Sequence, residues 1–511
     1  MKKKYLSLLL ILILSSLSSC TLNSAFSLST TKTIAPSTSN TSSISSAIDT
    51  TTKPINNNYY KIDEVNHNYH DLGLENKYYN WHYMNSIGDQ KILVVPVIIN
   101  DYSENATEKV KEDLNIALFS DGENERIGYE SLRSFYYKSS YGKLNLSGTI
   151  TSWMAGYDSE DLFFDPYDDE FDPLYVLYDD FDDFIDKEID DLTIYDSDKD
   201  GYIDLVIFVY SAPDNEHDPS LDDNYWAYTN SCEYKIPNIN HPTLNNYIWV
   251  SYDFLYEEDY HDEYYLSAYT FIHEFGHALG LDDYYGTDYY DLTGSSVVMS
   301  SCIGDHDAFS KFSLSWINPY VVYGDAVITI NSFYKSGDAI ILPIIPKEEK
   351  EFDNNAFSEY LIFEYYTVEG MNAKCVEHTY DNYPAINGSG IRVFYINAKL
   401  AYDDSRGRTH AVDYYYEFDD NKGEGLLPAF SNYYSIYDVR DKSDPALIKL
   451  LDKSNNSIYK STTSATHKVL YKDSSYLRTR DFTFYGSRTL DYYITFTKNK
   501  DDSFTITFHK N

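Results

Sequence analysis

The sequence predicts a mixed α/β (α+β) domain over residues 59–318, followed by an all-β domain of the sandwich type over residues 319–511. Before residue 318, short β-branched apolar runs, which are typical of buried strands, alternate with stretches of helical spacing. After Pro319, short alternating segments are separated by turns rich in Asn, Asp and Gly, which favours a β-sandwich. Hydrophobic residues make up 43% of the 511 residues, enough to bury a core in each domain.

In the first domain, strands and helices are placed from their apolar patterns. Lys91–Ile99 (KILVVPVII) is a β-branched apolar run, and Tyr247–Tyr252 (YIWVSY) has the same character. Asp196–Tyr210 begins as an acidic turn and continues as an apolar strand. Helical spacing appears in Glu130–Lys138 and again between residues 174 and 189, where Leu, Phe and Ile residues share one face.

The second domain is predicted from a series of short strands without a repeat of fixed period. Their alternation of apolar and polar residues is typical of strands with one face in a core. The expected strands are Ala326–Ile330, Ala339–Ile345, Tyr360–Tyr366, Gly390–Ile396, Tyr492–Thr497 and Ser503–Phe508.

Residues 1–20 have the pattern of an export signal. Three lysines precede the apolar run Leu6–Leu14, which is shorter than the about 20 residues of a membrane span. Small residues then lead to Cys20, which resembles the bacterial lipoprotein signal, whose cleavage leaves a lipid-modified N-terminal cysteine; a plain secretory signal is the alternative. Residues 21–58, mostly Ser, Thr and Asn, predict a flexible stalk. We therefore expect an extracellular protein, lipid-anchored to the outer face of the bacterial cell membrane or shed through its stalk.

The net charge restricts the partners of the chain. It carries 40 Lys and Arg against 81 Asp and Glu, a formal charge of −41. Binding to nucleic acid or anionic lipid needs clustered cations, so nucleic acid is excluded and membrane contact is expected through the N-terminal lipid only. No feature specifies an oligomer, and we expect a monomer. After Cys20, the three remaining cysteines, Cys232, Cys302 and Cys375, allow at most one disulfide.

The strongest functional signal is the helical motif FIHEFGHALG, which contains His273, Glu274 and His277. Histidines four residues apart share a helix face, so both imidazoles can bind one metal ion, with Glu274 beside them. The opposite side of the helix is apolar and available for the core. Its residues are Phe271, Ile272, Phe275, Ala278 and Leu279. The alternative interpretation is a surface helix with two solvated histidines.

The residues after the helix supply a candidate third ligand. Gly280 permits the left-handed turn that ends the helix, and the redirected chain can bring Asp283 to the metal, with the adjacent Asp282 as the alternative. Three protein ligands leave a fourth position for water. Two imidazoles and a carboxylate in that arrangement predict one catalytic zinc ion rather than a structural one.

A second metal pattern follows residue 195 in the stretch DSDKDGYIDLVI. Acids at positions one, three, five and nine, with glycine at six, match a calcium loop, and hard carboxylate oxygens suit that ion. These acids are Asp196, Asp198, Asp200 and Asp204. The twelfth position is Ile207 instead of a bidentate glutamate, so a full EF-hand is not expected. A weak calcium site and an acidic solvated turn both stay open.

Further segments carry a resemblance that extends beyond His273–Asp283. They are Ser131–Gly142 with Gly148 and Trp153, Asp196–Tyr210, Val298–Ser300, Ala308–Trp316, Ser358–Tyr366 and Gly390–Ile396. Together they resemble the immune inhibitor A-like secreted metalloproteases, the M6 peptidases on the metzincin branch. Ser315 stands where that family usually has glycine.

This resemblance implies a metzincin-like zincin catalytic domain and a hydrolase that cleaves peptide bonds of extracellular proteins and peptides. Metzincins place a methionine beneath the zinc-binding histidines, and Met299 fits by its position. Glu274 is then expected to act as general base toward a zinc-activated water and to deliver the proton to the leaving amine. From the zincin architecture, the strand around Trp249 is expected to pair along its edge with an extended substrate.

The alternative function is a surface-anchored lipoprotein that binds glycans or proteins through its tyrosine-rich β domain and keeps a vestigial protease fold. The presence of Glu274 disfavours it, because a decayed site is expected to lose its base and its ligands first.

Overall fold

The computed structural model describes most of the chain beyond the N-terminal region. Cys20, the export signal and the stalk lie outside its ranges, apart from residues 57 and 58. Within the described residues, every helix is too short or too polar to cross a bilayer. The described residues are 57–62, 83–122, 126–162, 174–232, 235–258, 264–285, 292–344, 359–377, 385–397, 400–403, 409–411, 427–428, 447–459, 464–482 and 490–511.

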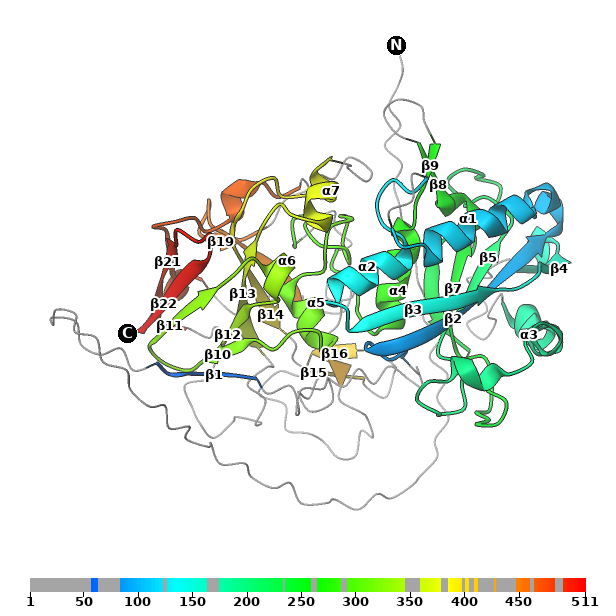
Figure 1. The fold of residues 1–511 in the computed structure, drawn as a ribbon, viewed down its shortest axis with the longest axis horizontal. Coiled ribbons are helices and arrows are strands. Elements are labelled where there is room, and N and C mark those ends of the chain that lie inside the picture. Colours follow the sequence, from blue (N-terminus) through cyan, green and yellow to red (C-terminus); the bar gives the residue numbers. More distant parts are fainter. Residues whose placement is uncertain are drawn as a thin grey trace, which may run out of the picture.

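A six-stranded sheet forms the N-terminal part of the molecule (Figure 1). Its order is β3-β2-β5-β7-β6, with β4 also paired to β2, and every pair is parallel except β6 with β7. The strands are β2 (Gly88–Ile99), β3 (Leu144–Ile150), β4 (Met154–Tyr157), β5 (Val206–Tyr210), β6 (Tyr228–Ser231) and β7 (Asn246–Ser251). The strands predicted at 91–99, at the end of 196–210 and at 247–252 are thereby confirmed.

Helices cover both faces of this sheet, which explains why its central strands are continuously apolar. Ile92 and Val94 of β2 point into the core that holds α1, α2 and α4, whereas Leu93 and Val95 point into the core that holds α3. The helices are α1 (Glu108–Phe119), α2 (Leu132–Ser139), α3 (Tyr175–Glu188) and α4 (Tyr269–Ala278). Both helices predicted before residue 190 are confirmed, and α2 begins at a capping box between Ser131 and Ser134.

Two further sheets dominate the part of the chain after residue 318. A seven-stranded sheet has the order β1-β10-β12-β13-β14-β18-β19, and a four-stranded sheet has the order β11-β22-β21-β20. Their strands are β1 (Tyr59–Lys61), β10 (Tyr320–Val322), β11 (Ala326–Ile330), β12 (Ala339–Pro343), β13 (Glu359–Tyr366), β14 (Gly390–Asn397), β18 (Ile448–Asp452), β19 (Ser457–Ile458), β20 (Tyr476–Arg478), β21 (Tyr492–Lys498) and β22 (Phe504–Lys510). All six strands predicted there are present.

The remaining elements are short. Two small sheets pair β8 (Tyr256–Glu258) with β9 (Tyr264–Leu266), and β15 (Leu400–Asp403) with β16 (Thr409–Ala411) and β17 (Leu427–Pro428). The short α-helices are α5 (Ala308–Ser313), α6 (Phe333–Ser336) and α7 (Met371–Glu377). The 3-10 helices are Asn100–Asn105, Ser159–Leu162, Leu192–Tyr195, Tyr252–Leu255, His467–Val469 and Thr479–Asp481. The expectation of an all-β segment after residue 318 is wrong in detail, because α6 and α7 interrupt its strands.

The chain is thus a mixed α/β structure in which the seven-stranded sheet is also buried on both faces. One face packs on the four-stranded sheet, with Leu361 and Phe363 of β13 in the shared cluster. On the other face, Ile362 belongs to the hydrophobic cluster that also contains residues of helix α4. In addition, β1 pairs with β10, so a strand from before residue 318 belongs to the later sheet. The division into domains at residue 318 stays a prediction, and the hydrophobic core is continuous across it.

Candidate active site

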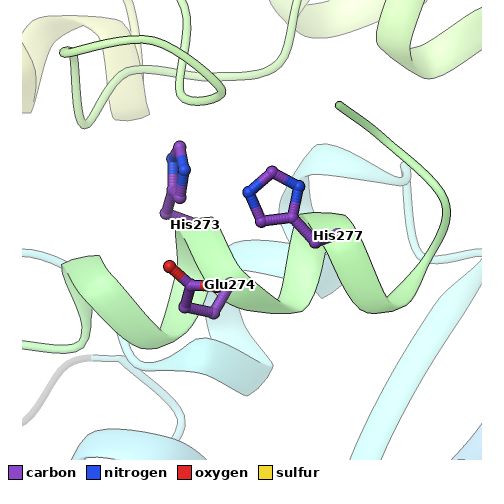
Figure 2. Close-up of side chains that lie close together, drawn as sticks. All are labelled: His273, Glu274 and His277. Atoms are coloured by element: carbon purple, nitrogen blue, oxygen red, sulfur yellow. The ribbon is translucent and has the colours of Figure 1, made fainter. Parts of the chain in front are cut away.

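Helix α4 presents three groups that can hold or serve a metal ion. His273 and His277 rise from the same side of the helix, and Glu274 lies beside them (Figure 2). One nitrogen or oxygen atom of each of the three side chains lies within 4.8 Å of the others. The opposite side of the helix is buried in the core, as predicted, through Phe271, Ile272, Phe275, Ala278 and Leu279. The helix therefore serves both as core and as a platform for the site.

The chain reverses directly after the helix. Gly280 has φ +93°, a left-handed conformation in which its N–H donates to His277 O (2.8 Å) and the following Leu281 N–H donates to Gly276 O (3.0 Å). The reversal returns Asp283 to the histidines, where its Oδ1 lies 3.1 Å from His273 Nε2 and 3.3 Å from His277 Nε2. The structure thus brings Asp283 beside both histidines, and its role as a metal ligand stays a prediction.

The distances among these atoms suit a shared metal ion. Ligand atoms bound about 2.1 Å from a tetrahedral zinc lie about 3.4 Å apart, close to the two spacings at Asp283 Oδ1. His273 Nδ1 lies 3.0 Å from Val298 O, and His277 Nδ1 lies 2.8 Å from Leu281 O. A carbonyl oxygen only accepts, so each Nδ1 carries a hydrogen, which leaves each Nε2 as the nitrogen that can bind a metal once it is deprotonated.

Electrostatics also favour a cation at this position. Burial disfavours the imidazolium of His277, but Asp283 and then Glu274 outweigh it and raise the pKa of His277 to about 10. Burial also opposes ionisation of Asp283, yet the neighbouring imidazoles hold the pKa of this carboxyl below its usual value. The two carboxylates thus favour positive charge at this cluster, and a divalent ion would take the place of the proton on His277.

The adjacent Asp282 has a different environment. Burial raises its pKa to about 7, with His277 opposing this and Asp283 adding to it. Among the described contacts, it is Asp283 and not Asp282 whose carboxylate reaches both Nε2 atoms. The structure therefore supports Asp283 as the third ligand candidate.

Met299 lies beneath the histidine helix. Its side chain is fully buried, and a Cβ added at Gly276 would collide with its sulfur, so the glycine in HEFGH permits the close approach. Its backbone O accepts from Tyr284 N (2.7 Å), and the preceding residue supplies the carbonyl that orients His273. The position expected for Met299 is confirmed, and the turn that contains it also orients one histidine.

Sequence reasoning missed a buried ion pair that holds this turn. Arg392 Nε donates to Glu364 Oε1 (2.6 Å), and Arg392 also donates to Ser296 O (2.8 Å) just before Met299. Glu364 in turn accepts from Ala308 N (2.7 Å) at the start of α5. Strands β13 and β14 thus position the segment below the site, and no local pattern in the sequence indicates this pairing.

Sequence reasoning also missed Thr229. Its hydroxyl on β6 lies 3.0 Å from Glu274 Oε2 and 2.9 Å from Glu274 O, so it can hold the carboxylate in place. An isolated threonine in a short polar strand gives no sequence signal of this kind.

If the protein is the peptide hydrolase that the resemblance implies, Thr229→Val should reduce kcat by about 10-fold to 100-fold, because a hydrogen bond to a charged group contributes about 1.5–3 kcal/mol. KM and zinc content should stay unchanged. Thr243→Val is a matched control, since the Thr243 hydroxyl donates to Ile236 O, in another loop. Equal losses in the two variants would contradict a positioning role for Thr229.

The strand around Trp249 is not an edge, so the expectation that it pairs with a substrate is wrong. Strand β7 lies between β5 and β6, and Trp249 is buried with its indole N–H donating to Asn224 O (2.9 Å). The edge of the sheet on the α4 side is β6, which carries Thr229. Among the described strands, β6 pairs with β7 alone, so its outer side, rather than β7, is where another strand could pair.

In the acidic loop before β5, only some of the acids predicted as calcium ligands lie close together. Oxygens of Asp196, Asp198 and Asp204 lie within 4.8 Å of one another, whereas Asp200 is not in this group. The backbone N–H groups of Asp200 and Gly201 donate to Asp196, which shapes the loop. Burial raises the pKa of Asp204 to about 7 against the hydrogen bonds from Ser197, and the neighbouring acids raise it further. Three of the four predicted ligands thus fit a cation.

If calcium binds there, millimolar calcium should raise the melting temperature of the protein by about 2–4 °C, because binding to the folded state alone stabilises it. Asp196→Asn should remove this shift, while Asp190→Asn, at an exposed acid nearby, should keep it. Thermal unfolding of both variants with and without calcium measures the difference. A shift that persists in Asp196→Asn would place the calcium elsewhere.

Comparison with known proteins adds no assignment, because no family model and no curated protein matches this sequence.

Proposed function

We propose that the protein is a zinc-dependent metalloendopeptidase that hydrolyses peptide bonds of extracellular proteins. One observation carries the proposal: His273 Nε2, His277 Nε2 and Asp283 Oδ1 converge at spacings suited to one metal ion, next to the carboxylate of Glu274. Two imidazoles and a carboxylate match zinc, and a three-residue set leaves a position open for chemistry. The fold proposed with this function is a metzincin-like catalytic domain followed by a β-sandwich.

Zinc, when bound, would act as a Lewis acid that makes water a nucleophile near neutral pH and polarises the scissile carbonyl. His273, His277 and Asp283 would hold it. Glu274 would accept a proton from the attacking water and deliver it to the departing amine nitrogen. Thr229 would keep that carboxylate oriented during both transfers.

An extended peptide would add to the edge strand β6, because this strand has one side paired to β7 and also carries the residue that contacts Glu274. Backbone pairing would place the scissile bond close to the general base without requiring a particular side chain. The substrate class is therefore unstructured or locally extended protein.

We propose the same cellular setting that the sequence predicts, an exported protein anchored through lipid on Cys20 or shed. Calcium at Asp196, Asp198 and Asp204 would have a structural role, since these acids lie on the turn that leads into β5.

The test is to measure zinc content and casein hydrolysis on the same purified exported protein. We expect about one zinc per chain, with cleavage that a zinc chelator abolishes and added zinc restores. Absence of zinc at this site would overturn the proposal and favour the binding-protein alternative.

A further inference from the structure

Two of the three cysteines beyond Cys20 meet in the core. Cys302 lies three residues after Met299, and Cys375 lies on helix α7, 73 positions further along the chain. Their Sγ atoms are 2.6 Å apart, and both residues are fully buried. The turn at residues 298–302, here called the methionine turn, therefore touches α7 through a pair of sulfur atoms; Figure 1 labels α7.

Hydrogen bonds that do not include the sulfur atoms hold the segments around the two cysteines. Asp305 N donates to Asn372 Oδ1 (3.1 Å), which joins the segment after Cys302 to α7. On its other side, α7 is held by Lys374, which donates to Tyr129 O (2.7 Å) and Glu130 Oε1 (2.8 Å). One hydrogen bond thus joins the two segments that carry the cysteines, and the contacts of Lys374 fix α7 against residues 129 and 130.

Further contacts lead from Asp305 toward the candidate site. Asp305 also accepts from Ser139 Oγ (2.6 Å) and Lys311 Nζ (2.6 Å), both buried. Met299 on the same turn supports Gly276 between the two histidines. A covalent bond from Cys302 to α7 would therefore restrain the turn on which the site rests.

We propose that Cys302 and Cys375 form a disulfide in the exported protein, which fastens the methionine turn to α7. Each thiol loses one proton and the pair loses two electrons to an external disulfide, such as oxidised glutathione or an extracytoplasmic thiol–disulfide oxidoreductase. One protein S–S bond forms, one donor S–S bond breaks, and two donor thiols are released. An oxidising compartment, which the export signal predicts, is where such a bond persists.

Residue-specific thiol labelling tests the bond without reference to zinc or hydrolysis, so its failure is distinct from failure of the proposed function. The exported protein is denatured without reductant, alkylated, then reduced and alkylated with a second reagent. We expect Cys302 and Cys375 to carry only the second label and Cys232 the first. First-label modification of Cys302 and Cys375, in protein that was incubated with oxidised glutathione while folded and freed of it before denaturation, would overturn the proposal.

Thermal unfolding provides the second readout. A reductant should lower the melting temperature of the wild type by about 5–10 °C, because a bond closing a loop of this length restrains the unfolded chain. The double variant Cys302→Ala, Cys375→Ala should unfold at the same temperature with and without reductant. Cys232→Ser, as the matched control, should keep the full reductant effect. Equal reductant shifts in wild type and double variant would contradict the bond.

Discussion

Glu274→Ala is expected to lower kcat/KM for casein by about 10³-fold or more while leaving one zinc bound per chain. The reason is that Glu274 is proposed to move the proton, whereas His273, His277 and Asp283 are proposed to hold the metal. Paired measurement of zinc content and casein hydrolysis on the same preparation separates the two roles. Glu274→Gln, which keeps the shape of the side chain, should lose activity to a similar extent.

The outcome discriminates between roles for this carboxylate. Loss of zinc together with activity would indicate that Glu274 is a metal ligand. Its position allows this role, because one of its oxygens lies within 4.8 Å of a nitrogen of each histidine. Retention of most activity would rule out its role as general base. Glu188→Gln is a suitable control, because this exposed glutamate accepts from Ser152 and lies outside the site.

Asp283→Asn is expected to weaken zinc affinity by about 10²-fold or more, and Asp282→Asn to leave it within a few-fold of the wild type. The neutral amide keeps the size of the side chain but removes the charge that faces both imidazoles. Competition with a chromophoric zinc chelator measures both affinities, and circular dichroism checks that the two variants are folded.

These two variants form a matched pair, since they remove the same charge from adjacent positions of one turn. The reverse result, with zinc lost in Asp282→Asn only, would show that the turn rearranges when the metal binds. Equal losses would indicate a general effect of charge on the site and would leave neither residue as the specific third ligand.

Much of the fold was predictable because its signals are local. The β-branched run in β2 and the helical spacing in α4 are set by neighbours a few residues away, and both elements formed where expected. The HExxH spacing likewise fixes the relation of His273 and His277, since residues four apart on a helix share a face. Gly280 marked the helix end, because its left-handed φ suits glycine.

Other features could not be predicted from local sequence patterns. The order of the strands decides that β6 and not β7 lies at the edge of the sheet. The apolar sequence around Trp249 does not distinguish a central strand from an edge strand. Helices α6 and α7 are too short, at four and seven residues, to show a periodic pattern among strands. The pairing of β1 with β10 joins segments about 260 positions apart, a distance at which sequence spacing carries no information.

The sequence by itself therefore determined the histidine pair, the general base candidate, the acidic loop and the strands with the strongest apolar patterns, since each depends on short-range periodicity or spacing. Only the tertiary structure decided that Asp283 rather than Asp282 reaches both imidazoles, that Thr229 contacts Glu274, and that Cys302 meets Cys375. Such contacts join residues on different elements, and their geometry follows from how those elements pack around one core.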